Sequence, residues 1–187
     1  MVLELVKNAE LFAKKKHSGM TSKDGTPTSK HLEAVVNRLK SLGVIDKELL
    51  CSGWLHDTIE DTDTSFDDLF EQFGSRVAVL VLSLSKDTSL PKKRKEQAYT
   101  KQLKEASFDA KLIKLCDISA NLSDLKKYSP SKSRQRNYLK LKRRNLVVIK
   151  NDLISNTDYP KTISLLESIN KILKQYGLGT ISLQSKI

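Results

Sequence analysis

The sequence is poor in residues that break or cross-link a chain. Its 187 residues include 7 glycines, 4 prolines, 2 cysteines and 1 tryptophan. Two cysteines exclude a disulfide-built scaffold. Cys51 and Cys116 lie in apolar helical patterns without metal-site spacing, so we predict two reduced core thiols in a cytoplasmic protein. No apolar run approaches the roughly 20 residues that cross a bilayer, and the N-terminus lacks the apolar stretch of a signal peptide.

The spacing of apolar residues predicts helices almost throughout. The segment 77–85, "VAVLVLSLS", contains enough β-branched residues for a strand. No second strand is available to pair with it, so we assign a buried helix. We expect one all-α domain over 1–187, with a core at 9–155 and a C-terminal helix and loose tail at 156–187. The predicted helices are 2–16, 30–42, 47–60, 65–73, 75–85, 92–105, 109–126, 131–155 and 160–175.

Positive charge is in excess. Lysine and arginine number 33 against 22 acids, which gives a net charge of +11. Such a balance suits an anionic partner, namely nucleic acid, an acidic membrane surface or a small molecule with several phosphates. Much of the excess lies in 91–95 and 131–144, and a purely solvated basic face remains an alternative reading of both runs.

The stretch "WLHDTIEDT" (54–62) places a histidine and several acids directly behind an apolar run. His56 and Glu60 are four residues apart, as are Asp57 and Asp61, so a single helix over 47–60 would present them as two adjacent columns. Buried carboxylates are costly unless something compensates them. A cation against this side of the helix would supply that compensation.

A second acid interrupts the apolar pattern of "AKLIKLCDISANLSDL" (110–125). Asp117, Asn121 and Asp124 make a polar stripe there, and Asp117 requires either a lysine partner, a capping role or a cation. Together, His56, Asp57, a distant histidine and Asp117 would offer two nitrogens and two carboxylates, a set that suits Mn, Fe, Co or Zn. Such an ion polarises phosphoryl oxygens. Glu60 and Asp61 would then orient water or move a proton.

These parts resemble the hydrolase domain of the RelA/SpoT alarmone enzymes, a branch of the HD phosphohydrolase superfamily. The matching motifs are "FAKKKHSG" (12–19), "KDGTP" (23–27) leading to His31, "LHDTIEDTDTS" (55–65), "FGSRV" (73–77) and 110–125. Length and "LPKKRK" (90–95) look most like the small stand-alone hydrolases of metazoan type. The resemblance implies an all-α HD-domain helical bundle and a Mn(II)-dependent enzyme that hydrolyses (p)ppGpp to GDP or GTP and pyrophosphate.

The resemblance also implies roles for individual residues. The acid pair acting on water would be Glu60 and Asp61, and His17 would be structural. The metal ligands would be His31, His56, Asp57 and Asp117. Contacts to the nucleotide or its phosphates would come from Lys23, Arg94, Lys95, Asn121 and Tyr138. The partner would be a small phosphorylated nucleotide rather than a membrane or nucleic acid.

The departures fall on the side that recognises the base. Ser22 stands where the family has an arginine whose planar cation packs against guanine. Five further residues differ from those that the family usually has at the same places, namely Thr28, Ser29, Leu32, Ile118 and Ser123. Two alternatives therefore remain open: the same chemistry on another phosphorylated nucleotide, such as NADPH or an adenine analogue, and a non-catalytic nucleotide- or RNA-binding HD module. The second would have lost a ligand or the acid pair, and neither is lost.

Overall fold

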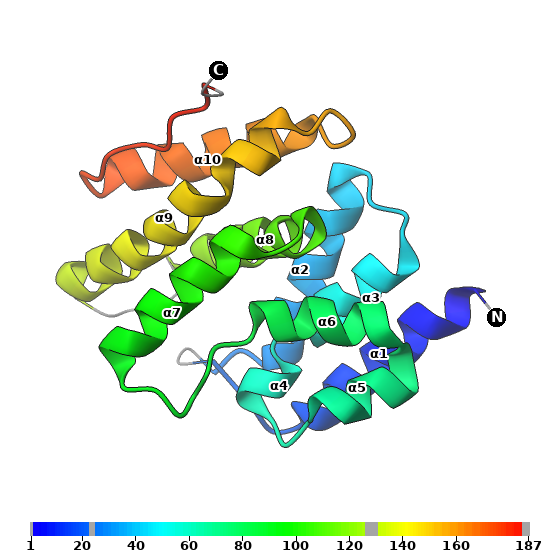
Figure 1. The fold of residues 1–187 in the computed structure, drawn as a ribbon. Helices are drawn as coiled ribbons and strands as arrows, with labels where there is room; N and C mark the ends of the chain where they lie inside the picture. Colours follow the sequence, from blue (N-terminus) through cyan, green and yellow to red (C-terminus); the bar gives the residue numbers. More distant parts are fainter. Residues whose placement is uncertain (1, 23–24, 126–130, 185–187) are drawn as a thin grey trace.

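The chain is built from α-helices (Figure 1). The computed structural model describes residues 2–22, 25–125 and 131–184. Within these ranges no strand is formed, and only an isolated bridge joins Thr21 to Pro27. The all-α prediction is therefore confirmed. The helices are α1 (Val2–Lys16), α2 (Thr28–Leu42), α3 (Lys47–Leu55), α4 (Thr58–Asp61), α5 (Phe66–Phe73), α6 (Ser75–Leu84), α7 (Lys92–Glu105), α8 (Phe108–Asp124), α9 (Lys132–Ser155) and α10 (Lys161–Gln175).

Short polar residues set several helix ends. The Asp46 carboxylate accepts a hydrogen bond from Leu49 N at the start of α3, over 3.0 Å. Ser65 and Asp68 form a reciprocal capping box at the start of α5. Gly43 ends α2 in the left-handed region with φ of 100°, where a residue without a Cβ is unstrained. These bonds satisfy backbone groups that a helix leaves unpaired at its ends.

Helix α8 lies at the centre of the molecule and packs against α2, α3, α6, α9 and α10. It is apolar on nearly every side, as a fully surrounded helix must be. The α8 residues with at most 3% exposure are Ala110, Leu112, Ile113, Leu115, Cys116, Ile118, Ala120 and Leu122. Its buried polar residues, which include Asp117, consequently need partners from neighbouring helices.

Segment 77–85 is helical, as predicted. It forms most of α6, and Val77, Ala78 and Val81 are fully buried there. Arg76, at the start of this helix, donates to Asp46 and Asp109 over 2.8 Å each and thereby ties α6 to the beginnings of α3 and α8.

Residues 178–184 differ from the loose tail that we expected; residues 185–187 lie outside the described residues. Ile181 is 2% exposed, and its backbone N–H donates to the side chain of Asn170 on α10 over 2.7 Å. Asn170 donates in return to the Ile181 carbonyl over 2.9 Å. The side chains of Arg143 and Lys150 on α9 donate to the carbonyls of residues 179 and 182. An amide with both a donor and an acceptor can thus dock an irregular segment, which apolar spacing does not reveal.

Both thiols are buried and free. Burial raises the pKa of Cys51 to about 12, and it also raises that of Cys116, so neither is a reactive thiolate. In the part of the chain that the structure describes, no helix has both the length and the apolar character needed to cross a membrane.

Candidate metal centre and cavity

The "HDTIED" stretch is not the continuous helix that we predicted. Helix α3 ends at Leu55 and α4 begins at Thr58, so His56 and Asp57 form a break between two helices. Asp57 has φ of −100° and ψ of −4°, in the bridge region where many active-site residues occur. The expected two columns of side chains on one helix are therefore wrong, and the break itself directs the histidine and the aspartate.

Side chains satisfy the carbonyls at this break. Thr58 Oγ1 donates to the Leu55 carbonyl over 2.6 Å, and His56 Nδ1 lies 2.9 Å from the Gly53 carbonyl. Both side chains are buried. A buried carbonyl without a partner is costly. These two bonds therefore stabilise the break relative to a continuous helix.

Gly53 brings α3 close to α2. A Cβ placed on this residue would lie 2.7 Å from Cδ1 of Leu39 and 3.2 Å from Cγ2 of Val36. The absence of a side chain therefore permits the approach of the two helices. Their approach places His56, just beyond the end of α3, beside His31 on α2, and the ring centroids are 5.4 Å apart.

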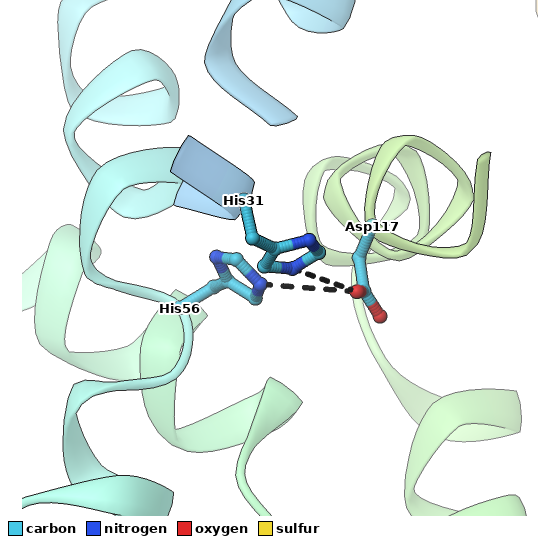
Figure 2. A group of neighbouring side chains, drawn as sticks. All are labelled: His31, His56 and Asp117. Carbon is cyan, nitrogen blue, oxygen red and sulfur yellow. Dashed lines mark ion pairs between the residues drawn. The ribbon is translucent and has the colours of Figure 1, made fainter. Parts of the chain in front are cut away.

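Four predicted ligands meet between α2, the break and α8. His31 Nε2 lies 3.2 Å from Asp117 Oδ1 and 3.8 Å from Asp57 Oδ2. His56 Nε2 lies 3.3 Å from Asp57 Oδ2 and 4.0 Å from Asp117 Oδ1. One ligand atom from each of His31, His56 and Asp117 lies within 4.8 Å of the others (Figure 2). The structure thus gathers two nitrogens and the Asp117 carboxylate around one point, and it places Asp57 beside the two histidines but outside this group of three.

The hydrogen bond of His56 determines which of its ring nitrogens can bind a metal. A carbonyl oxygen only accepts, so His56 Nδ1 carries the proton that it donates to Gly53, and its Nε2 presents a lone pair. Burial lowers the pKa of this ring and keeps it neutral. Nε2 is buried without a hydrogen-bond partner while facing two carboxylate oxygens. Acceptors that converge in this way fit a metal cation, and the bond to Gly53 orients the ring as such ligands require.

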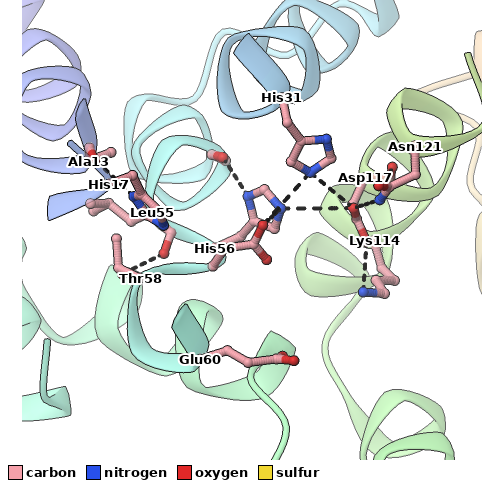
Figure 3. Close-up of polar contacts among 12 residues, drawn as sticks. Ala13, His17, His31, Leu55, His56, Thr58, Glu60, Lys114, Asp117 and Asn121 are labelled. Carbon is pink, nitrogen blue, oxygen red and sulfur yellow. Dashed lines mark hydrogen bonds and ion pairs between the residues drawn. The ribbon is translucent and has the colours of Figure 1, made fainter. Parts of the chain in front are cut away.

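Asp117 lies near two lysines. Its Oδ2 accepts from Lys114 Nζ over 2.7 Å (Figure 3), and Lys142 Nζ lies 3.7 Å from the same oxygen. Asn121 donates to Oδ1, the oxygen that faces the histidines. Burial alone would raise the pKa of Asp117, but Lys114, Lys142 and His31 hold it well below its ordinary value. The carboxylate is therefore ionised, with one oxygen directed toward the point between the histidines.

The pKa of His31 also reflects the negative charge of the carboxylates around it. Burial alone would lower this pKa, but the hydrogen bond that His31 donates to Asp117 and the charges of Asp117 and Asp57 raise it above its ordinary value. His17 lies outside the cluster, where its Nδ1 contacts the Ala13 carbonyl at 2.8 Å (Figure 3).

The cluster opens into a cavity of about 460 Å³. Glu60 and Asp61 both line it, one turn beyond Asp57. Glu60 is held by Lys86, whose backbone N–H and Nζ contact its two oxygens at 3.2 and 3.3 Å. Burial, together with the charges of Asp57 and Glu60, raises the pKa of Asp61 to about 6. This value is well placed for proton transfer near neutral pH.

The predicted nucleotide contacts divide into three groups. Asn121 and Tyr138 line the cavity. Arg94 and Lys95, in the first turn of α7, are not among the described residues that line it. Lys23 lies outside the described residues. Arg94 and Lys95 of the basic run 91–95 therefore do not line the described cavity.

Three lysines that we did not single out line the cavity instead. They are Lys86, just after α6, Lys114 on α8 and Lys142 on α9. Lys114 carried a usable signal, because it lies within an apolar helical run three residues before Asp117. Lys142 is one cation among many in 131–144, and Lys86 follows a helix end, so neither stood out.

Of the departures from the family pattern, Ser22 and Thr28 line the cavity, whereas Ile118 and Ser123 on α8 are not among its described lining residues. Ser22 lines the cavity in a tight loop, in which its N–H donates to the Thr26 carbonyl over 2.8 Å. Ser123 accepts a 2.7 Å hydrogen bond from Arg38 on α2, and Ile118 is fully buried. Ser123 therefore links α8 to α2, and Ile118 belongs to the core.

Comparison with known proteins explains this geometry. A model of the HD domain family matches residues 9–147. The chain belongs to the HD domain family. It is 41% identical over 122 residues to guanosine-3′,5′-bis(diphosphate) 3′-pyrophosphohydrolase MESH1 of Danio rerio, which covers 64% of this chain and 68% of that protein. The human protein of the same name is 38% identical over 122 residues, with the same coverage of both chains.

A solved structure shares the whole architecture. It belongs to a metazoan orthologue of SpoT that hydrolyses ppGpp, with 28% sequence identity and a TM-score of 0.79. The match covers 94% of this HD-domain chain and 97% of that chain. Hydrolases of the HD domain family depend on metal, and the histidine–aspartate cluster of this chain is a site of the corresponding composition.

Proposed function

We propose that this protein is a metal-dependent phosphohydrolase that removes the 3′-diphosphate of guanosine tetra- or pentaphosphate, giving GDP or GTP and pyrophosphate. The observation that carries the proposal is the placement of the acid pair. Glu60 and Asp61 line the same cavity as His31, Asp57 and Asp117, in a chain whose relatives bear the name of this reaction.

The metal would be held by His31, His56, Asp57 and Asp117, and Mn(II) is the ion we propose. Two imidazoles with two carboxylates combine donors suited to transition metals with donors suited to harder cations. When bound, the ion supplies Lewis acidity beside the reacting phosphoryl group. Lys114 holds Asp117 through the oxygen that faces away from the histidines, so Oδ1 stays directed at the metal position.

The acid pair would orient the attacking water and accept a proton from it. Water adds to the phosphorus bonded to the ribose 3′ oxygen, and that phosphorus–oxygen bond breaks. Asp61, with a pKa of about 6, is ionised at neutral pH and would accept a proton from the attacking water. Glu60, fixed by Lys86, would orient that water. The leaving 3′ oxygen takes up a proton from solvent, and Asp61 later releases its proton to solvent, so no net proton is gained by the protein.

The loop before α2 offers few groups that could select a base. Its described residues that line the cavity are Ser22, Thr26 and Pro27, followed by Thr28 at the start of α2, and none of these is aromatic or charged. Neutral short side chains of this kind favour a second candidate, the same hydrolysis on another phosphorylated nucleotide, such as NADPH or an adenine analogue.

One assay separates these candidates. The purified protein is loaded with Mn(II), and release of pyrophosphate or phosphate is measured for guanine-, adenine- and nicotinamide-containing substrates. We expect the highest kcat/KM for guanosine tetraphosphate. A higher value for an adenine or nicotinamide substrate would replace the first candidate by the second, and no release from any substrate would contradict both.

A further inference from the structure

Three lysines reach the cavity from segments that are distant in sequence. The side chains of Lys86, Lys114 and Lys142 are 22%, 9% and 14% exposed. Lysine is almost never buried to this degree without a partner, because its charged form loses solvation. The partners of each ammonium group therefore indicate which of them remains available to a ligand.

Lys114 is already bound to a protein group. Its Nζ lies 2.7 Å from Asp117 Oδ2. Lys142 Nζ lies 3.7 Å from the same oxygen, which is longer than a hydrogen bond, and 5.3 Å from the centroid of the Tyr138 ring. An ammonium group has three N–H donors, so Lys142 retains donors that face the cavity.

Lys86 lies on the side of the cavity that carries the acid pair. Its Nζ is 3.3 Å from Glu60 Oε1 and 5.2 Å from the centroid of the Tyr99 ring. Lys114 Nζ is 5.1 Å from the same centroid. The ring thus has two ammonium groups beside it, and Lys86 also keeps donor capacity after its bond to Glu60.

The charge of the cavity depends on the metal. Its lining holds four carboxylates, Asp57, Glu60, Asp61 and Asp117, against three lysines. With these seven groups ionised and His31 neutral, as a metal ligand must be, their charges sum to one negative charge. A divalent ion at the cluster would convert this to one positive charge, which leaves the lysines free to attract a bound anion.

We propose that Lys86 and Lys142 form a subsite that holds a diphosphate group of the substrate beside the metal centre. This inference rests on the proposed function. It assigns phosphate recognition to two lysines that line the cavity, in place of Arg94 and Lys95, which are not among its described lining residues. Lysine binds phosphate oxygens as a point charge with several donors, which suits a group with many equivalent oxygens.

Two groups of the substrate have this chemistry. One is the 3′-diphosphate that leaves as pyrophosphate, and the other is the 5′-diphosphate that stays on GDP. Binding of each product to the metal-loaded protein separates the two sources without any turnover. The protein is freed of unbound ion by desalting and then titrated calorimetrically with inorganic pyrophosphate and, separately, with GDP.

The variants are Lys142→Gln and Lys86→Gln, with Lys140→Gln as the matched control. Lys140 is exposed on the same helix as Lys142, two residues earlier. Hydrogen bonds to charged groups are strong enough that losing one weakens binding about 10- to 100-fold. We expect a loss of this size for one of the two products in each cavity variant and an unchanged Kd in the control.

Metal content after each titration completes the test. Lys142 lies near Asp117 and repels a cation there, so Lys142→Gln should bind the metal at least as tightly as the wild type. Loss of pyrophosphate binding assigns the subsite to the 3′-diphosphate, and loss of GDP binding assigns it to the 5′-diphosphate. No binding of either product to the wild type, unchanged binding in both cavity variants, or an equal loss in Lys140→Gln would overturn the proposal. Failure of substrate hydrolysis alone would concern only the proposed function.

Discussion

Replacing Lys114 with methionine tests whether Asp117 faces a metal. The ammonium of Lys114 and the carboxylate of Asp117 lie 2.7 Å apart, with side chains only 9% and 5% exposed. Methionine keeps most of the volume and removes the charge. Asp117 then stays buried with Lys142, at 3.7 Å, and His31, at 3.2 Å, as its cationic or titratable neighbours, and with Asn121 as a neutral hydrogen-bond donor to Oδ1.

The expected loss of stability is large without metal. Breaking a buried ion pair by removing one partner costs about 3–5 kcal/mol. We expect the low end, about 3 kcal/mol, because Lys142 and His31 still compensate part of the Asp117 charge. For a chain of this size, that corresponds to a fall in Tm of about 6–12 °C.

With a divalent metal bound, the same substitution should cost roughly half as much or less, because the ion compensates Asp117 in place of the lysine. The measurement is thermal unfolding of the wild type and Lys114→Met in EDTA and in excess Mn(II), followed by circular dichroism. The metal-induced rise in Tm should be larger in the variant than in the wild type.

Lys111→Met is the control on the same helix. Its side chain is 8% exposed and pairs with Asp152 on α9, whose side chain is 49% exposed. The partner left behind is half in water, so the loss should be smaller and independent of metal. An equal loss for Lys114→Met with and without metal would refute the assignment of Asp117 as a ligand.

Other expected outcomes concern the acid pair, the ligand Asp57 and the loop. Glu60→Gln and Asp61→Asn should lower kcat about 100-fold or more with metal content unchanged; full activity in both would remove the pair from the mechanism. Because the pKa of Asp61 in the free protein is about 6, its carboxylate is protonated below that pH, so wild-type kcat/KM should fall as pH drops through 6. Asp57→Ala should shrink the rise in Tm that Mn(II) produces; an unchanged rise in calorimetry would exclude Asp57 as a ligand. Ser22→Arg should lower KM for guanosine tetraphosphate about 5- to 30-fold through a cation–π contact with the base; a strong guanine preference in the wild type that the variant leaves unchanged would contradict this account of the loop.

Apolar spacing determined most of the fold. Helices α1, α7 and α9 lie where the 3.6-residue period predicts them, within one residue at each end. The acids at 57, 60, 61 and 117 were conspicuous because each interrupts a pattern that otherwise leads into a core. These are local properties, readable over one or two helical turns, and they identified the residues from which the site is made.

Only the tertiary structure decided how these residues meet. The break at His56 and Asp57 depends on bonds to the carbonyls of Gly53 and Leu55, which compete with a helix that the local sequence equally permits. The cations that line the cavity were decided by packing, because Lys86 and Lys142 come from segments more than 50 residues apart. A surplus of positive charge predicts an anionic partner, but which lysines face it depends on long-range packing of helices, which composition and periodicity do not encode.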